Sequence, residues 1–403
     1  MIISYIRKEI GYFKKLHSDA QRLVLSFFLY GVGTPLVSTF INAFIWKNSH
    51  DFMSVVLYNI GNWVMLPAIF FINGYLLQFI KMPFLFGAGL FLTALAPFIL
   101  IMFSVNGYWS IFAIGALFGI GYGLYWANRN FYILRATKSE DRNYFFSLTF
   151  AIDTLTNMIT PFVIGWFIVF GQQFAYQILA LALFFFYILA GIVVLPLTIS
   201  PSEHSHGLLK NPKRKWKLIR FTTTGFCLQS GINYTLPSLI VLTLLGNEGI
   251  LGTVSSLGSL LSAIVLYQIG KVALVHHRLH IFTVGVIILV MGALSFTFFP
   301  YGLGVIAYVV GTSISSNFNW IAYDSIVMDV VDEHTAFEKH NRYQYIFDNE
   351  VYINIGRIIG VGVFFIFYSL TSQMEALRFT PIFIAVTQIG ALYLVRQIVV
   401  HKE

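Results

Sequence analysis

Long apolar stretches follow one another along almost the whole chain, and this repetition constrains the fold more than any other feature. A helix that crosses a bilayer needs about 20 mostly apolar residues, and it satisfies its own backbone hydrogen bonds, as hydrocarbon demands. The sequence predicts an all-α membrane protein with twelve spans, at 22–46, 52–78, 84–104, 109–133, 143–169, 172–197, 219–244, 248–270, 281–300, 302–328, 343–370 and 377–397.

Composition agrees with this class. Only 10% of the residues are charged, whereas an ordinary soluble domain has about 25%, so the chain lacks the charges to cover a soluble surface. The single cysteine, Cys227, excludes a disulfide framework. The HHRLH run at 276–280 is compatible with a metal site, but a solvated basic loop is the favoured interpretation. We predict no metal and no cofactor.

Basic residues fall mainly on one side of the predicted spans. With the N-terminus inside, 21 of the 25 Lys and Arg residues lie on inner segments, as the positive-inside rule requires. Both termini are predicted to be cytoplasmic, in a bacterial inner (plasma) membrane. The basic first stretch is predicted to be an amphipathic helix on the inner surface, since its apolar run is too short for a signal.

The basic residues are scattered over many short loops, so nucleic acid is not a predicted partner. The predicted partners are membrane lipids, a small-molecule substrate and protons, and the chain is predicted to be a monomer.

The two halves of the chain resemble each other. A polar stretch at 199–220 interrupts the apolar spans. It divides the chain into a first bundle (1–198) and a second bundle (219–403), joined by a linker (199–218). "DTLTNMITPFVIG" in the fifth span aligns with "EVYINIGRIIGVG" in the eleventh, pairing Asp153 with Glu350, and "YWANRNFYIL" aligns with "NWIAYDSIVM". Gly61 and Gly258 also correspond. Parallel repeats of six spans are a transporter architecture.

Charges follow the same repeat. The third, sixth, ninth and twelfth spans carry no Asp, Glu, Lys or Arg in their apolar cores. A helix that faces lipid must be apolar nearly all round, whereas one that lines a wet cavity can carry polar groups. The other eight spans are therefore expected to surround a central cavity.

Twelve spans, a six-plus-six repeat and a basic central linker together resemble the major facilitator superfamily over essentially the whole chain. The resemblance implies two pseudo-symmetric six-helix bundles. The family's Gly-rich signature is reduced after the second span to "NGYLLQFIKMPF", which keeps Gly74 and Lys81 but lacks the acid and the arginine. The segment "TPFVIG" partly matches a motif of the family's exporters, which slightly favours export.

The most informative polar groups lie in the eleventh span. Glu350, Asn354 and Arg357 share one helix face, with about 10 Å between the first and the last, and Asp348 points toward a neighbouring helix. A carboxylate exposed alternately to the two sides, with its pKa near the ambient pH, carries one proton per cycle. Asp153, Glu350 and Asp348 are therefore proton-coupling candidates; the alternative is a buried ion pair that only locks helices together.

Further polar and aromatic residues on the cavity helices are candidates for contact with substrate, although each is equally compatible with a helix–helix contact. The substrate-binding candidates are Arg357, Asn354, Asn157, Trp126, Trp320, Asn317, Asn319, Gln229, Asn233, Tyr234, Asn59 and Trp63. Arg129 and Asp324 are gate candidates, with snorkelling of Arg129 to the interface as the alternative. Pro35, Pro237 and Pro161 are hinge candidates.

These features predict a secondary active transporter of a small organic solute, amphiphilic or aromatic, that works by alternating access, with proton coupling and with export favoured. Three alternatives stay open: a nutrient-uptake symporter, a lipid flippase or scramblase of the same fold, and a non-transporting membrane sensor. The chain has no GxxxxGK[ST] stretch and no catalytic cluster within a span, so it is not predicted to be an enzyme.

Overall fold

The computed structural model describes residues 13–14, 16–136, 142–197, 208–270, 277–335 and 342–400, and these are helical almost throughout. Residues 1–12, where the surface helix is predicted, and the linker residues 199–207 lie outside them. The first half contains α2 (Ser18–Pro35), the π-helical turn η1 (Leu36–Phe40), α3 (Ile41–Ser49), α4 (Phe52–Leu76), α5 (Met82–Met102), α6 (Tyr108–Ala136) and α7 (Arg142–Val194). The second half contains α8 (Arg214–Leu245), α9 (Glu248–Gly270), α10 (Arg278–Phe298), α11 (Gly302–Thr335), α12 (Arg342–Leu370) and α13 (Gln373–Val400).

α7 covers both the fifth and the sixth predicted spans. Its helix breaks at Gln172, where φ is 47° and ψ is −131°. This is the conformation of the first central residue of a tight II′ turn, which usually requires glycine. The two spans are therefore joined by a sharp turn with no intervening loop.

Ten of the described helices are long and apolar enough to cross a membrane, so the predicted count of twelve is not matched one for one. One of the ten contains the fifth and sixth spans together. α11 coincides with the tenth predicted span but is not among the ten; its centre carries the polar run Thr312–Asn319, which lowers its mean hydropathy.

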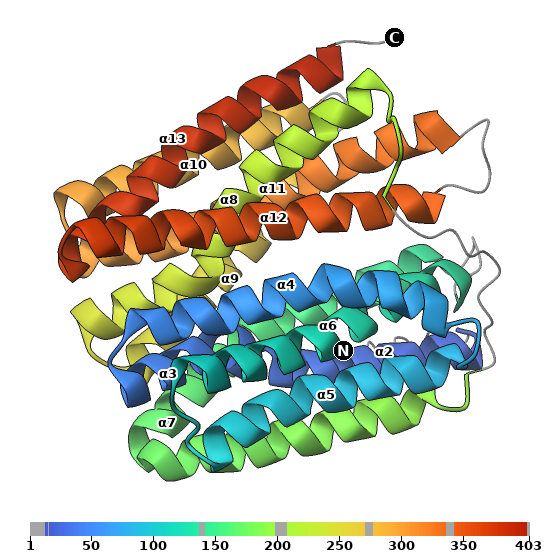
Figure 1. Ribbon diagram of the computed structural model, residues 1–403, viewed down its shortest axis with the longest axis horizontal. Coiled ribbons are helices and arrows are strands. Elements are labelled where there is room, and N and C mark those ends of the chain that lie inside the picture. Colours follow the sequence, from blue (N-terminus) through green and yellow to red (C-terminus); the bar gives the residue numbers. More distant parts are fainter. Residues whose placement is uncertain are drawn as a thin grey trace, which may run out of the picture.

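The helix pairs in the two halves correspond (Figure 1). α4 packs on α6 and α5 on both α6 and α7 in the first half, as α9 packs on α11 and α10 on both α11 and α13 in the second. The pairing of α2 with α7 likewise corresponds to that of α8 with α12. Gly61 and Gly258 occupy equivalent interfaces, α4 against α6 and α9 against α11. The chain thus folds into two pseudo-symmetric helical bundles.

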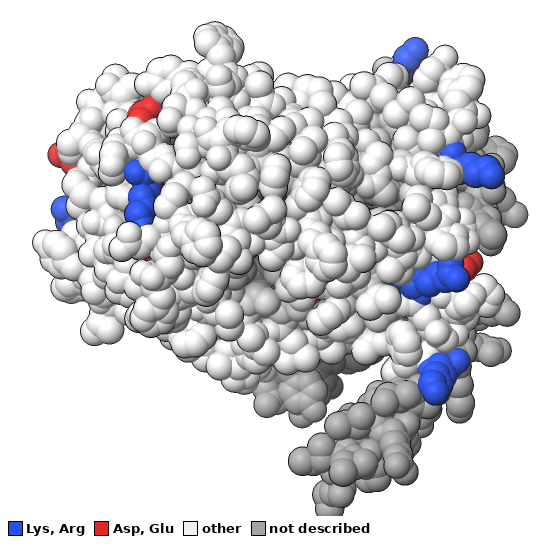
Figure 2. Space-filling model, turned by 90° about the horizontal axis from the view of Figure 1, so that it is seen from below, with Lys and Arg blue, Asp and Glu red and all other residues white. Residues whose placement is uncertain are grey.

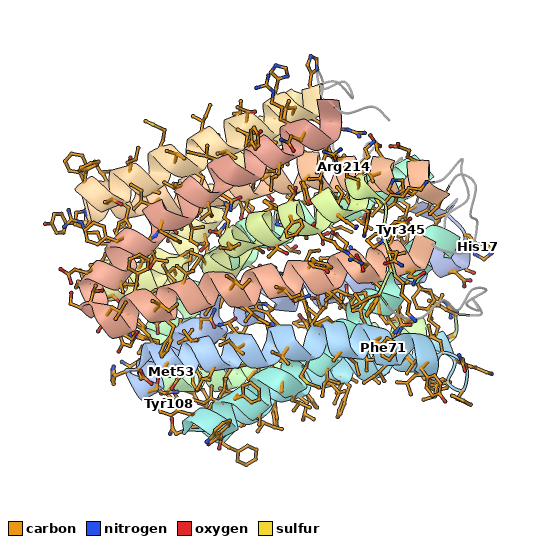
Figure 3. The ribbon with its side chains drawn as sticks, turned by 45° about the horizontal axis from the view of Figure 1, so that its top comes forward. His17, Met53, Phe71, Tyr108, Arg214 and Tyr345 are labelled. Carbon is orange, nitrogen blue, oxygen red and sulfur yellow. The ribbon has the colours of Figure 1, made fainter. Side chains whose placement is uncertain are left out.

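The helices run between two distinct ends. We call the end that holds the segment 208–213 the linker end and the other the turn end. His17, Arg214 and Tyr345 lie at the linker end, and Met53 and Tyr108 lie at the turn end (Figure 3). On the face shown in Figure 2, charged side chains lie mostly near the two ends, and the broad middle band is nearly all uncharged, as a bilayer requires.

α8 begins earlier than the sequence suggested. Its first residue is Arg214, five residues before the expected start of the span at 219. The extra turn is basic, but Trp216 within it is fully buried and Lys215 pairs with Glu333 at 2.5 Å. Tertiary contacts at the linker end therefore extend the helix beyond its apolar stretch.

A polar cavity between the two halves

A cavity of about 580 Å³ lies between the two halves. Its lining is dominated by small polar side chains from α2, η1, α7, α8, α9 and α11. These are Thr34, Ser38, Thr39, Asp153, Thr154, Asn157, Ser230, Asn233, Ser238, Ser255, Ser259, Ser262, Thr312, Ser313, Ser316 and Asn317. Three rings, Phe150, Tyr234 and Trp320, also line it. Among the described residues, Asp153 is the only charged one in the lining, so the cavity suits a neutral or cationic solute that forms many hydrogen bonds.

Hydroxyl groups along two helices produce this polarity. On α9, Ser255, Ser259 and Ser262 are spaced by four and then three residues, which places all three on one helix face. On α11, which packs against α9, Thr312, Ser313 and Ser316 add three more hydroxyl groups to the lining. These six residues were not among the predicted substrate-binding candidates, although the spacing on α9 is visible in the sequence.

Several predicted residues reach the cavity. Asp153, Asn157, Asn233, Tyr234, Asn317, Trp320 and the hinge candidate Pro237 all line it. The remaining substrate candidates lie outside its lining: Arg357, Asn354, Trp126, Asn319, Gln229, Asn59 and Trp63. The carboxylate of Asp153 forms no hydrogen bond or ion pair within the described residues, so it is free to interact with a bound solute or with water.

The predicted column on α12 forms a hydrogen-bonded series behind the cavity wall. Nδ2 of Asn354 donates to Oε1 of Glu350 at 3.0 Å, and Nη1 of Arg357 donates to Oδ1 of Asn354 at 3.3 Å. Arg357 also donates through Nε to Oγ of Ser230 at 3.4 Å and lies over the ring of Tyr234. Since Ser230 and Tyr234 line the cavity, the column contacts it through them.

Asp348 has a different setting from Glu350. It is fully buried, and Nε and Nη2 of Arg220 donate to its two carboxylate oxygens at 2.8 and 2.6 Å. Nε1 of Trp216 and the backbone N–H of Leu209 add two more hydrogen bonds, at 2.7 and 3.2 Å. Asp348 thus faces a neighbouring helix, as predicted, and joins α12 to α8 and the linker rather than lining the cavity.

Arg129 and Asp324 do not form an ion pair in the described part of the chain. The guanidinium of Arg129 lies over the rings of Phe27 and Trp126, 4.6 and 4.7 Å from their centroids, and Asp324 is exposed. The gate pair is therefore not formed in this conformation.

Other predicted polar residues connect helices. Asn59 donates to Oδ1 of Asn42 at 3.0 Å, and Asn42 donates to the backbone carbonyl of Tyr234 at 2.6 Å. That carbonyl lies three residues before Pro237, where the proline disturbs the helical hydrogen bonds. Gln229 of α8 donates to Ser315 of α11, whereas Asn319 donates to Ser315 within its own helix. The contacts of Asn59 and Gln229 match the helix–helix alternative for these two residues.

A helix irregularity lies directly beside one of the three hinge candidates, Pro35, whereas Pro237 lies inside the continuous helix α8. The π-helical turn η1 begins directly after Pro35, and such turns often occur where proline disturbs a helix. At Pro161 the two halves meet instead: a Cβ on Gly252 would lie 2.1 Å from the carbonyl oxygen of Pro161, and one on Gly165 would lie 2.3 Å from that of Glu248. Only glycine permits α7 and α9 to approach so closely.

The cavity lies on the linker side of this contact. In α7, Asp153 and Asn157 precede Pro161, and in α9 the three serines follow Gly252. On the turn side, Nζ of Lys47 pairs with Oε1 of Glu248 at 2.8 Å, and the hydroxyl of Tyr176 donates to the same oxygen at 3.2 Å. The glycine contact and this ion pair close the cavity toward the turn end.

Known proteins share this architecture. The chain is 26% identical over 376 residues to an uncharacterized protein, YqgE, of Bacillus subtilis (strain 168), covering 90% of this chain and 85% of that protein. A crystal structure of a variant of the nucleoside transporter NupG has a TM-score of 0.72 at 10% identity, covering 95% of this chain and all of that one. An inward-facing bacterial homologue of the iron transporter ferroportin has a TM-score of 0.67 at 11% identity, covering 95% and 99% of the two chains.

The sequence profile of the Major Facilitator Superfamily matches residues 23–360. Together with the apolar helices and the paired bundles, this match identifies an integral, multi-pass membrane protein. The chain belongs to the major facilitator superfamily.

Proposed function

We propose that this protein transports a small polar organic solute by alternating access, and that the cavity between its halves is the substrate site. The observation that carries the proposal is the position of this cavity: it lies where the halves meet and is closed toward the turn end by the contact of α7 with α9. Its volume is in the range of small-molecule sites, about 300–1,000 Å³. Rocking of the halves about such a site is how transporters of this architecture expose it to either side.

The lining supports a particular kind of solute. Hydroxyl and amide groups both donate and accept hydrogen bonds, and Trp320 and Tyr234 offer ring faces for stacking. Since Asp153 carries the only charge among the described lining residues, the lining favours a neutral or cationic molecule that combines a ring with several hydroxyl or amine groups. Nucleosides have this chemistry and are the first class to test, followed by amphiphilic amines.

Coupling to protons is proposed to use Asp153. Asp153 lines the cavity, and its carboxylate forms no hydrogen bond or ion pair with the described residues, so it can take up and release a proton without breaking an ion pair. The column from Glu350 to Arg357 is proposed to sense occupancy through Ser230 and Tyr234. Export is the proposed direction, and the linker end is proposed to face the cytoplasm.

The test uses the purified protein in two steps. A thermal-stabilisation screen identifies a ligand, because a ligand that binds only the folded state raises the melting temperature. Proteoliposomes with an internal pH dye then report proton movement when that ligand is added. We expect Asp153→Asn to abolish proton movement, while Asp51→Asn, which keeps a cap at the start of α4, retains it.

Two results would contradict the proposal. Unchanged proton movement in Asp153→Asn would remove the coupling role. Unchanged ligand affinity after Ser259→Phe, which fills the cavity, would place the substrate elsewhere.

A further inference from the structure

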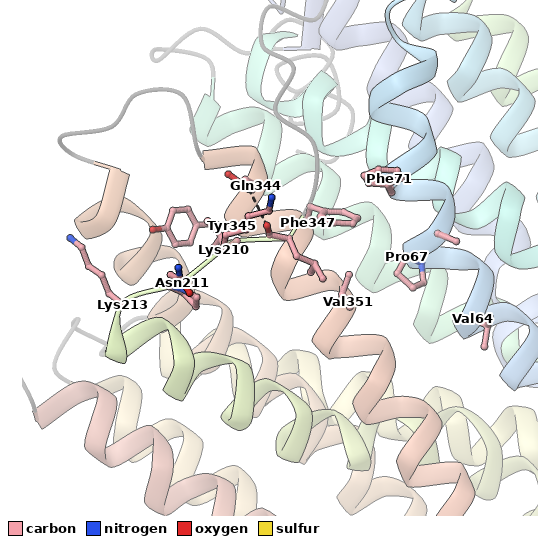
Figure 4. A pocket seen from close by; sticks show the side chains of 14 residues that line it. Val64, Pro67, Phe71, Lys210, Asn211, Lys213, Gln344, Tyr345, Phe347 and Val351 are labelled. Atoms are coloured by element: carbon pink, nitrogen blue, oxygen red, sulfur yellow. Dashed lines mark hydrogen bonds between the residues drawn. The ribbon is translucent and has the colours of Figure 1, made fainter.

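A second and larger pocket lies outside the substrate cavity, at the linker end where the two halves meet. Its volume is about 990 Å³. Four α4 residues including Val64 and Phe71, the linker segment 208–213, and four α12 residues including Phe347 and Val351 line it (Figure 4). α4 and α12 pack against each other and lie side by side on the near face in Figure 1. The pocket is therefore at a seam that the surrounding bilayer can reach.

One wall of the pocket is apolar. Val64, Ala68 and Phe71 share one face of α4 and are exposed, Val64 by 44% and Phe71 by 49%. From Val64 to Phe71 the helix rises about 10 Å, which covers about two thirds of the depth of one leaflet, about 15 Å of hydrocarbon. The wall thus has the length and the polarity of a site for an acyl chain.

The rim of the pocket is cationic. Lys210 and Lys213 line it and are exposed, and neither forms an ion pair within the described residues. The part of the lining that the structure describes contains no acidic residue. The nearby Lys215 and Arg220, in contrast, are paired with Glu333 and Asp348. The pocket therefore combines an apolar wall on α4 with two lysines on the linker segment that form no ion pair with the described residues.

The segment that carries these lysines is held in place. Leu209 donates its N–H to Asp348 at 3.2 Å and accepts from Arg220 at 2.9 Å through its carbonyl. Nε2 of Gln344 donates to the carbonyl of Leu208 at 3.3 Å. Asn211 has a φ of 53° and precedes Pro212, so the chain turns sharply between the two lysines. The buried Asp348 network thereby gives the rim a fixed shape.

We propose that this pocket binds one anionic membrane phospholipid. The phosphate-bearing headgroup lies between Lys210 and Lys213, and an acyl chain lies along Val64, Ala68 and Phe71. A lysine near a membrane surface favours an anionic lipid by about fivefold, so the pair discriminates against zwitterionic lipid. Because the pocket contacts α4 in one half and α12 in the other, a bound lipid holds the halves in this arrangement.

The experiment measures lipid binding to the delipidated, purified full chain in detergent. Phosphatidylglycerol, phosphatidylcholine and glycerol 3-phosphate are added separately, and the melting temperature and the number of lipids retained in native mass spectrometry are recorded. We expect one retained phosphatidylglycerol, a rise of several degrees with that lipid, a smaller rise with phosphatidylcholine, and none with glycerol 3-phosphate.

Variants locate the site. Lys210→Gln combined with Lys213→Gln should weaken phosphatidylglycerol binding at least tenfold, and Ala68→Trp, which fills the apolar wall, should abolish it. Lys81→Gln is the matched control, since Lys81 is an exposed lysine that precedes α5 and does not line the pocket; it should bind like the unmodified protein.

The proposal is overturned if phosphatidylcholine stabilises as strongly as phosphatidylglycerol, or if the double lysine variant or Ala68→Trp binds like the unmodified chain. Stabilisation by glycerol 3-phosphate would assign the rim to a soluble anion and would equally overturn a lipid site. None of these results depends on transport of a substrate, so the lipid site and the proposed transport function are tested independently of each other.

Discussion

Nζ of Lys47 lies 2.8 Å from Oε1 of Glu248, so one ion pair joins the end of α3 in the first half to the start of α9 in the second. The carboxylate side chain is 5% exposed and the lysine side chain is 52% exposed. The pair can exist only while the two halves are together at the turn end. It therefore contributes stability to this conformation and none to a conformation that is open there.

Glu248→Gln should shift the protein toward a conformation open at the turn end. Loss of a partly exposed pair costs roughly 1 kcal/mol, or about a fivefold change in the ratio of the two conformations. Spin labels on cysteines at positions 109 and 303 measure this shift as a distance distribution. Trp109 and Leu303 are 84% and 85% exposed on opposite halves, and the native Cys227 is buried.

The matched control is Glu375→Gln, an acid near the turn end whose carboxylate accepts hydrogen bonds from the N–H and the hydroxyl of the nearby Ser372. It should leave the distance distribution unchanged. An identical distribution in Glu248→Gln would show that the pair does not bias the conformation.

Gly252→Ala should open the same end more strongly. The added Cβ would lie 2.1 Å from the carbonyl oxygen of Pro161, a clash with backbone that only separation of α7 from α9 relieves. Gly390→Ala has open space around the new Cβ and should be neutral or stabilising by up to about 1 kcal/mol. The same pair of spin labels reports the opening. Equal behaviour of the two alanine variants would argue against a glycine-dependent closure.

Asp348→Asn should destabilise the fold rather than uncouple transport. Removing one partner of a buried ion pair costs about 3–5 kcal/mol, because Arg220 loses the carboxylate that both of its nitrogens contact. Thermal unfolding in detergent measures the loss. Asp329→Asn, which breaks an exposed pair with Arg278, should cost about 1 kcal/mol or less. An Asp348→Asn variant that melts normally but no longer moves protons would restore this residue to the coupling site.

Ser259→Ala should weaken substrate binding without loss of stability. Its hydroxyl lines the cavity, and one hydrogen bond contributes about 1 kcal/mol, or about fivefold in Kd. Isothermal titration with the ligand from the stabilisation screen measures the change. Ser325→Ala is the control, because that hydroxyl donates back to the carbonyl of Ile321 in its own helix. If both variants bind equally well, the α9 hydroxyls do not contact the solute.

Sequence reasoning placed the helices well, because an apolar stretch of membrane length has few other solutions. The Glu350, Asn354 and Arg357 column was also predictable, since helical periodicity alone puts the three on one face. The role of Asp348 was not: its partners Arg220 and Trp216 are distant in sequence and lie where the linker meets the helix. Periodicity indicated that Asp348 meets a neighbouring helix but not which groups would neutralise it.

The repeat predicted equivalent positions better than equivalent environments. Gly165 and Gly362 align in sequence, yet a Cβ on Gly165 would lie 2.3 Å from a backbone oxygen, whereas one on Gly362 would meet open space. The helix packing within each half is similar, but the contacts that these two glycines make with the opposite half differ. The membrane orientation, the location in a bacterial inner membrane, the monomeric state and the partners stay predictions.

The break at Gln172 has a consequence for how the protein is made. The two runs of helix in α7 have no loop between them. The first run therefore cannot be inserted across the bilayer and followed by a water-exposed loop on the far side before the second run enters. A nascent chain that ends before residue 194 contains only part of this helical hairpin. The translocon therefore has to insert the two helical runs together. Epitopes or protease sites meant to report topology belong at the Gly107 or Gly302 connections and not at this corner.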